Sequence, residues 1–164
     1  MSGRLRAITA GAFLALLASG GFLLLHLRGD GQTVDDLAFV DAAATASVTR
    51  DVSEAVQSAF TLDPSKPAAS TRAAHRWLTG NAVGEYDDLY GPLLSSARKE
   101  GLSLTTTVRA AGLTWLHTDE ARLLVLADQT GRTTAGQHRS GAAQLSITAV
   151  LVDGRWLVTD FTLL

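Results

Sequence analysis

The chain has 164 residues, no cysteine and a formal net charge of −2 at neutral pH. The absence of cysteine excludes a disulfide-stapled fold, so an exported domain of this chain must be held together by burial. From Gly29 onward, 11 Lys and Arg residues accompany 16 Asp and Glu residues, which leaves this part at about −5. An acidic balance argues against nucleic-acid or anionic-lipid partners, because both require clustered positive charge.

An uncharged segment near the N-terminus predicts a membrane anchor. Residues 7–27 contain no Asp, Glu, Lys or Arg. As a helix this segment is about 31 Å long, enough to cross a hydrocarbon core of about 30 Å. Arg4 and Arg6 precede it and acidic residues follow it, so the positive-inside bias places the N-terminus in the cytoplasm. We therefore expect a cytoplasmic tail (1–6), a single-pass transmembrane signal anchor in the cell membrane (7–27) and an extracytoplasmic domain (28–164).

A cleaved signal peptide is the alternative reading of the same segment. Ala18-Ser19-Gly20 offers small residues for cleavage after an apolar stretch. The run from Phe22 to Leu25 continues the segment to a full spanning length, which a signal peptide does not need. The anchor is favoured, and cleavage stays open.

Helical spacing follows the anchor. A first helix is expected from Thr33 to Phe60, because its apolar residues recur every three or four positions until Asp63-Pro64 stops it. A second helix is expected from Ala68 to Thr79, with Gly80 after its last turn. Helical spacing then continues across a break at Gly91-Pro92 and ends at Gly101.

From Leu102 the apolar residues alternate, which predicts strands. We expect a bulge at Ala111-Gly112 in the first strand, and a second strand over residues 121–128 that is apolar on both faces and therefore central. Residues Gln129 to Gly141 predict a long exposed loop, and Asp153-Gly154 predicts a type I′ hairpin turn between the last two strands. The fold class is α+β, with helices packed on one face of a curved four-stranded antiparallel sheet.

Four stretches carry a resemblance to a known family. They are Trp77-Leu78-Thr79-Gly80, Tyr86-Asp87, Asp128-Gln129-Thr130 and the run from Val152 to Val158. The chain resembles the Mce-associated membrane proteins of actinobacteria, which accompany mammalian-cell-entry (Mce) lipid-import systems. The resemblance implies a membrane-anchored external domain with the cone fold of nuclear transport factor two, related to the periplasmic domains of type IV secretion scaffolds.

The motifs for chemistry are sparse. Four histidines lie in four different segments, and the His117-Asp119-Glu120 turn is a weak ligand set that reads better as a solvated turn. We therefore expect no metal, no cofactor and no catalytic residue. Asp128 and Asp160 are the candidates for a general base, but nothing supplies the second polar group that such catalysis requires. The residues expected to line a pocket, if the cone holds one, are Trp77, Tyr86, Tyr90, Trp115, Asp128 and Asp160.

The sequence thus predicts a non-enzymatic accessory or assembly component of a cell-envelope complex with protein partners. An Mce-type lipid importer is the first expectation for that complex. The two alternatives are a carrier or sensor that binds a small apolar ligand in its cone, and a scaffold component of a secretion or conjugation system.

Overall fold

A computed structural model of the chain describes residues 42–164. The expected tail, the expected anchor and the start of the first helix lie outside the described residues. Among residues 42–164, no helix is both long enough and apolar enough to cross a membrane.

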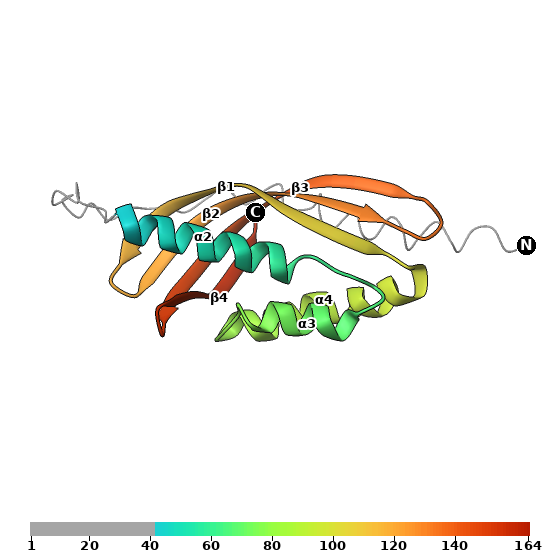
Figure 1. Cartoon of the computed structure of the whole chain (residues 1–164), viewed down its shortest axis with the longest axis horizontal. Helices are drawn as coiled ribbons and strands as arrows, with labels where there is room; N and C mark the ends of the chain where they lie inside the picture. The colour runs from blue at the N-terminus through green and yellow to red at the C-terminus, as the bar shows by residue number, and fades with distance from the viewer. Residues whose placement is uncertain (1–41) are drawn as a thin grey trace, which may run out of the picture.

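In this part of the chain three helices precede four strands, and the helices lie on one face of a curved sheet (Figure 1). The helices are α2 (Ala42–Ala59), α3 (Pro67–His75) and α4 (Asn81–Glu100). The strands are β1 (Ser103–His117), β2 (Glu120–Arg132), β3 (His138–Val152) and β4 (Arg155–Leu163). They form one antiparallel meander in the order β1-β2-β3-β4, which confirms the predicted α+β class and the four-stranded sheet.

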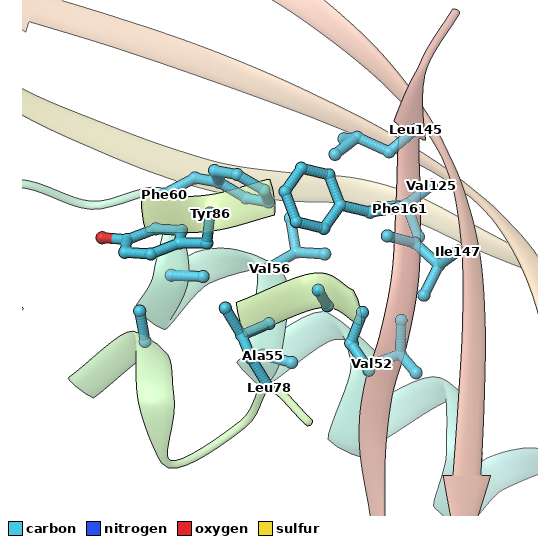
Figure 2. Close-up of a cluster of buried hydrophobic side chains, with 14 of the residues drawn as sticks. Val52, Ala55, Val56, Phe60, Leu78, Tyr86, Val125, Leu145, Ile147 and Phe161 are labelled. Carbon is cyan, nitrogen blue, oxygen red and sulfur yellow. The ribbon is translucent and has the colours of Figure 1, made fainter. Parts of the chain in front are cut away.

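The core forms along the apolar stripe that the sequence predicts for the first helix. Val48, Val52 and Val56 on α2 are at most 1% exposed, and α2 packs against β1, β4 and α3. The chain turns away after Phe60, whose ring lies with Tyr86 and Phe161 around Val56 (Figure 2). Full burial of each valine stabilises the fold by about 1.5–3 kcal/mol.

Two helix predictions need correction. The second helix ends at His75 and not at Thr79, because the backbone at Trp77 and Thr79 is hydrogen-bonded to Val158 of β4 instead of to the preceding turn. The third helix, α4, continues through Pro92 without the predicted break. Proline removes one backbone donor, and the buried residues on both sides of it share one face of the helix: Ala82, Tyr86, Tyr90 and Ala97.

The predicted long loop over residues 129–141 is wrong. β2 continues to Arg132 and β3 begins at His138, so the connecting tip spans only residues 133–137. The alternation of buried and exposed positions continues here with small and polar residues. Gln129 is buried, and a Cβ atom on Gly131 would lie 3.6 Å from the Leu102 side chain. Without large apolar side chains, the sequence pattern gave no sign that these strands continue.

The irregularities of β1 lie on either side of the predicted bulge, and the last turn lies where the sequence predicts it. β1 carries two register shifts, between Val108 and Ala110 and between Leu113 and Trp115, whereas Ala111 and Gly112 pair regularly with β2, so the predicted position of the bulge is wrong. Asp153 and Gly154 have φ angles of 50° and 79°, so the predicted two-residue turn of positive φ is confirmed.

A buried carboxylate joins α2 to the last hairpin. The side chain of Asp51 accepts a hydrogen bond from the backbone N–H of Trp156 at 3.0 Å, and its other oxygen lies 2.9 Å from Arg50 Nη2. Asp51 is 4% exposed and Trp156 is 3% exposed. The carboxylate therefore satisfies a backbone donor that water does not reach.

We predict that Asp51→Ala lowers the free energy of unfolding by about 1–3 kcal/mol, because the Trp156 N–H loses its acceptor inside the core. Asp51→Asn is the matched control, since it keeps an oxygen acceptor at the same position. Urea unfolding followed by tryptophan fluorescence measures both. Equal losses in the two variants would assign the effect to the ion pair with Arg50 and contradict this reading.

Candidate functional site

A small cavity lies where α2 ends and α4 crosses the sheet. Its volume is about 80 Å³, and its wall is formed by α4, the end of α2 and all four strands. The wall is apolar except for three polar side chains, those of Tyr90, Thr106 and Gln129. This cavity is the candidate binding site of the domain.

The three polar side chains form a connected chain of hydrogen bonds. Thr106 Oγ1 donates to the carbonyl oxygen of Phe60 at 2.6 Å, and Gln129 Nε2 donates to Thr106 Oγ1 at 3.2 Å. The Tyr90 hydroxyl is hydrogen-bonded to the Gln129 side chain. The three residues are at most 9% exposed, so the network is built into the core and most of its polar groups are satisfied there.

Aromatic rings fix the position of the Tyr90 hydroxyl. Tyr86 and Tyr90 stack with their centroids 4.8 Å apart and 11° between their planes. The ring of Phe60 lies 5.4 Å from Tyr90 and 5.4 Å from Phe161. Burial raises the pKa of Tyr86 to about 12, and burial raises the pKa of Tyr90 above its ordinary value despite the hydrogen bond from Gln129.

We predict that the tyrosines ionise only as the domain loses stability at high pH. A raised pKa in the folded state favours the neutral form, so this contribution is complete below the ordinary pKa of 10.0 and is lost as pH rises through about 12. Tyr86 and Tyr90 are the only tyrosines of the chain, so tyrosinate absorbance reports on them directly. Tyr86→Phe should remove part of the pH dependence of unfolding, and titration near 10 in the folded protein would contradict the prediction.

The cavity supports binding by shape better than acid–base chemistry. Its polar groups are two hydroxyls and one amide, and the tyrosine pKa lies far from neutral pH, whereas a general base works best with a pKa near the operating pH. A volume of about 80 Å³ is also small. Ligand sites in proteins are commonly about 300–1,000 Å³, and an engineered cavity that holds benzene measures about 150 Å³.

Of the six residues predicted to line a pocket, Tyr90 lines this cavity. Tyr86 stacks behind it in the core. Trp77 is half-buried beside the edge of β4, with the Arg155 guanidinium 5.2 Å from its ring centroid.

The other three predicted residues lie on the opposite face of the sheet. Trp115 is 43% exposed and stacks on His117. Asp128 pairs with Arg109 Nε at 2.6 Å. Asp160 is paired in register with Thr148, on the face of β4 opposite to buried Phe161.

Sequence reasoning missed Thr106 and Gln129. Gln129 continues the alternation of the buried residues Leu123, Val125 and Ala127, so its position in that series was the signal. Metal binding has no geometric support in residues 42–164, where no group of three His, Asp or Glu side chains is arranged to hold an ion.

No protein-family model matches this sequence. The M. tuberculosis protein Rv1362c, described as uncharacterized, is 29% identical over 155 residues, which cover 91% of this chain and 67% of the relative. The M. tuberculosis outer membrane protein Rv1973 is 25% identical over 152 residues, which cover 92% of this chain and 90% of the relative. Both are distant homologues.

Solved structures with the same fold come from type IV secretion. An IcmL-like secretion protein from Legionella pneumophila matches with a TM-score of 0.65 at 10% identity, over 73% of this chain and 91% of the other. The VirB8 homologue CagV from Helicobacter pylori matches with a TM-score of 0.61 at 9% identity, over 72% and 96%. VirB8 from Agrobacterium tumefaciens matches with a TM-score of 0.59 at 11% identity, over 73% and 90%. The domain therefore has the fold seen in VirB8-type proteins, and one of its distant homologues is described as an outer membrane protein.

Proposed function

We propose that this chain is a membrane-anchored, non-enzymatic assembly component of a cell-envelope complex, and that the complex is an Mce-type lipid importer. The fold is the observation that supports the assembly role, because it recurs in components of multiprotein secretion complexes. A homologue described as an outer membrane protein supports an envelope location. The assignment of the complex to an Mce-type importer rests on the four sequence stretches that resemble Mce-associated proteins.

The size of the cavity favours an assembly role over a lipid carrier. A cavity of about 80 Å³ has room for about two or three water molecules, and a lipid acyl chain needs several times more. A carrier would need an opened state of the domain. A secretion or conjugation scaffold is the second candidate, because its known components share this fold.

The tip between β2 and β3 is the surface that we assign to the partner. The tip lies at one end of the sheet, beside the corner between α4 and β1, whereas the two other hairpin turns lie at the opposite end (Figure 1). It is held in one conformation, since Thr133 N–H donates to the Gln137 carbonyl at 3.0 Å and Thr134 Oγ1 donates to the Glu100 carbonyl at 3.3 Å. A rigid projecting tip presents exposed side chains to a partner at low entropic cost.

We predict that a photo-crosslinking amino acid at Ala135 forms an adduct with a second envelope protein in cells that express an Mce-type importer. Thr118, in an exposed turn at the other end of the sheet, is the matched control. Mass spectrometry of the adduct identifies the partner. An importer subunit supports the proposal, a secretion component supports the second candidate, and no adduct at Ala135 contradicts the assigned surface.

We also predict that Asp160→Asn leaves the cellular role of the protein intact. The Asp160 carboxylate does not line the cavity, and it lies on the face of β4 opposite to buried Phe161. Complementation of a deletion strain, with protein levels measured alongside, tests this. Loss of complementation at normal protein levels would revive an enzymatic reading.

A further inference from the structure

Within residues 42–164, no helix or loop covers an apolar patch on the sheet face away from the helices. The side chains of β2 alternate strictly, with Leu123, Val125 and Ala127 buried under the helices and Leu124 and Leu126 facing outward. These two leucines are 39% and 40% exposed. Their register neighbours on β1 and β3 are small or polar: Ala110, Gly112, Gln144 and Ser146.

This composition differs from that of a solvent-facing sheet surface. An antiparallel sheet with one face in water normally carries polar residues on that face. Here two large apolar side chains stand at the centre of the sheet above small neighbours, and Trp115 adds an exposed ring on β1 beside Arg122. We define the outer patch as Trp115, Arg122, Leu124, Leu126 and Asp128.

The charges at the two ends of this row have opposite sign. Arg122 precedes the leucines and Asp128 follows them, each one outward position away. Their side chains are 63% and 45% exposed. Arg109 Nε contacts only Oδ2 of Asp128, and a carboxylate has room for a further arginine.

We propose that the outer patch is a self-association surface, on which a second copy of this chain packs face to face with its β2 antiparallel. The two-fold axis lies between the two sheets, perpendicular to β2 at the level of Val125. It places Arg122 of each copy over Asp128 of the other, so two such contacts form. It also places Leu124 over Leu126. Sheets that pack face to face lie about 10 Å apart, a distance that two facing leucines fill.

The charges select this arrangement over the other two-fold arrangement. With the axis parallel to β2, Arg122 would face Arg122 of the second copy, and Asp128 would face Asp128 of the second copy. This arrangement places like charges together. The antiparallel arrangement is thus the one in which this row of side chains is complementary to itself. This inference does not depend on the partner assigned to the tip of β2 and β3, which lies at one end of the sheet outside the patch.

Charge reversal tests the surface in the purified 164-residue chain in mild detergent, by analytical ultracentrifugation. Arg122→Glu and Asp128→Arg each place two like-charge contacts in the interface, so each should weaken self-association by about tenfold or more. A mixture of the two variants restores attraction at both contacts and should associate as the wild type does. Failure of the mixture to associate would overturn the proposal.

Leu124→Ser should abolish self-association with an unchanged circular dichroism spectrum, because the side chain is exposed in the monomer. Leu151→Ser is the matched control, since Leu151 is 37% exposed and lies outside the patch at the end of β3. A wild-type chain that stays monomeric, or a Leu124→Ser variant that associates normally, overturns the proposal. Protection of Leu124 in a monomeric wild type would assign the patch to another occupant, a different protein or the N-terminal segment, and would also overturn it.

The natural absence of cysteine allows a direct test of orientation. Thr148 and Ala142 lie beside Arg122 and Asp128 on β3, and replacing them leaves the charged row intact. A short bis-maleimide should link a Thr148→Cys copy to an Ala142→Cys copy in a mixture, and should not link either variant to itself. Self-linking of either variant contradicts the antiparallel arrangement.

Discussion

The burial of one face of α2 is the constraint on which the rest of the domain depends. In the described part of the chain the helices cover one face of the sheet, and α2 packs against both edge strands, β1 and β4. A sheet can contact one helix with both edges only if it curves around that helix, and the irregularities of β1 support such curvature. Beyond the end of α2 at Ala59, side chains of α4 cover the sheet, and the small cavity lies between the end of α2, α4 and the sheet.

Backbone hydrogen bonds also occupy part of each edge of the sheet. Leu62, just after α2, pairs with Leu104 of β1 through hydrogen bonds of 2.7 and 3.0 Å. Leu78 lies in the segment that pairs with Val158 of β4. These contacts occupy the edge of β1 at Leu104 and the edge of β4 at Val158, so another chain cannot pair with the backbone at these positions.

The sequence stretches behind the family resemblance have a structural explanation. Trp77 and Thr79 are joined by backbone hydrogen bonds to Val158, so two of the four stretches contact each other across the edge of the sheet. Gln129, in a third stretch, is part of the buried polar network. These stretches therefore help to hold the fold of this chain together, and the fold by itself leaves the partner open.

The sequence by itself determined the elements that have strong local signals. The valine stripe of α2, the stop at Asp63-Pro64, the turn at Asp153-Gly154 and the meander of four strands all follow from periodicity and turn chemistry. Only the tertiary structure decided where the weaker segments go. The strands run past Gln129 because α4 and Leu102 cover small residues there, and α3 stops early because its next residues pair with β4. Which polar residues meet is likewise a matter of long-range packing, since the Thr106–Gln129 contact joins neighbouring strands and the Asp51–Trp156 contact joins residues 105 positions apart. Local patterns carry no information about such contacts, because they arise only when the sheet closes over the helices.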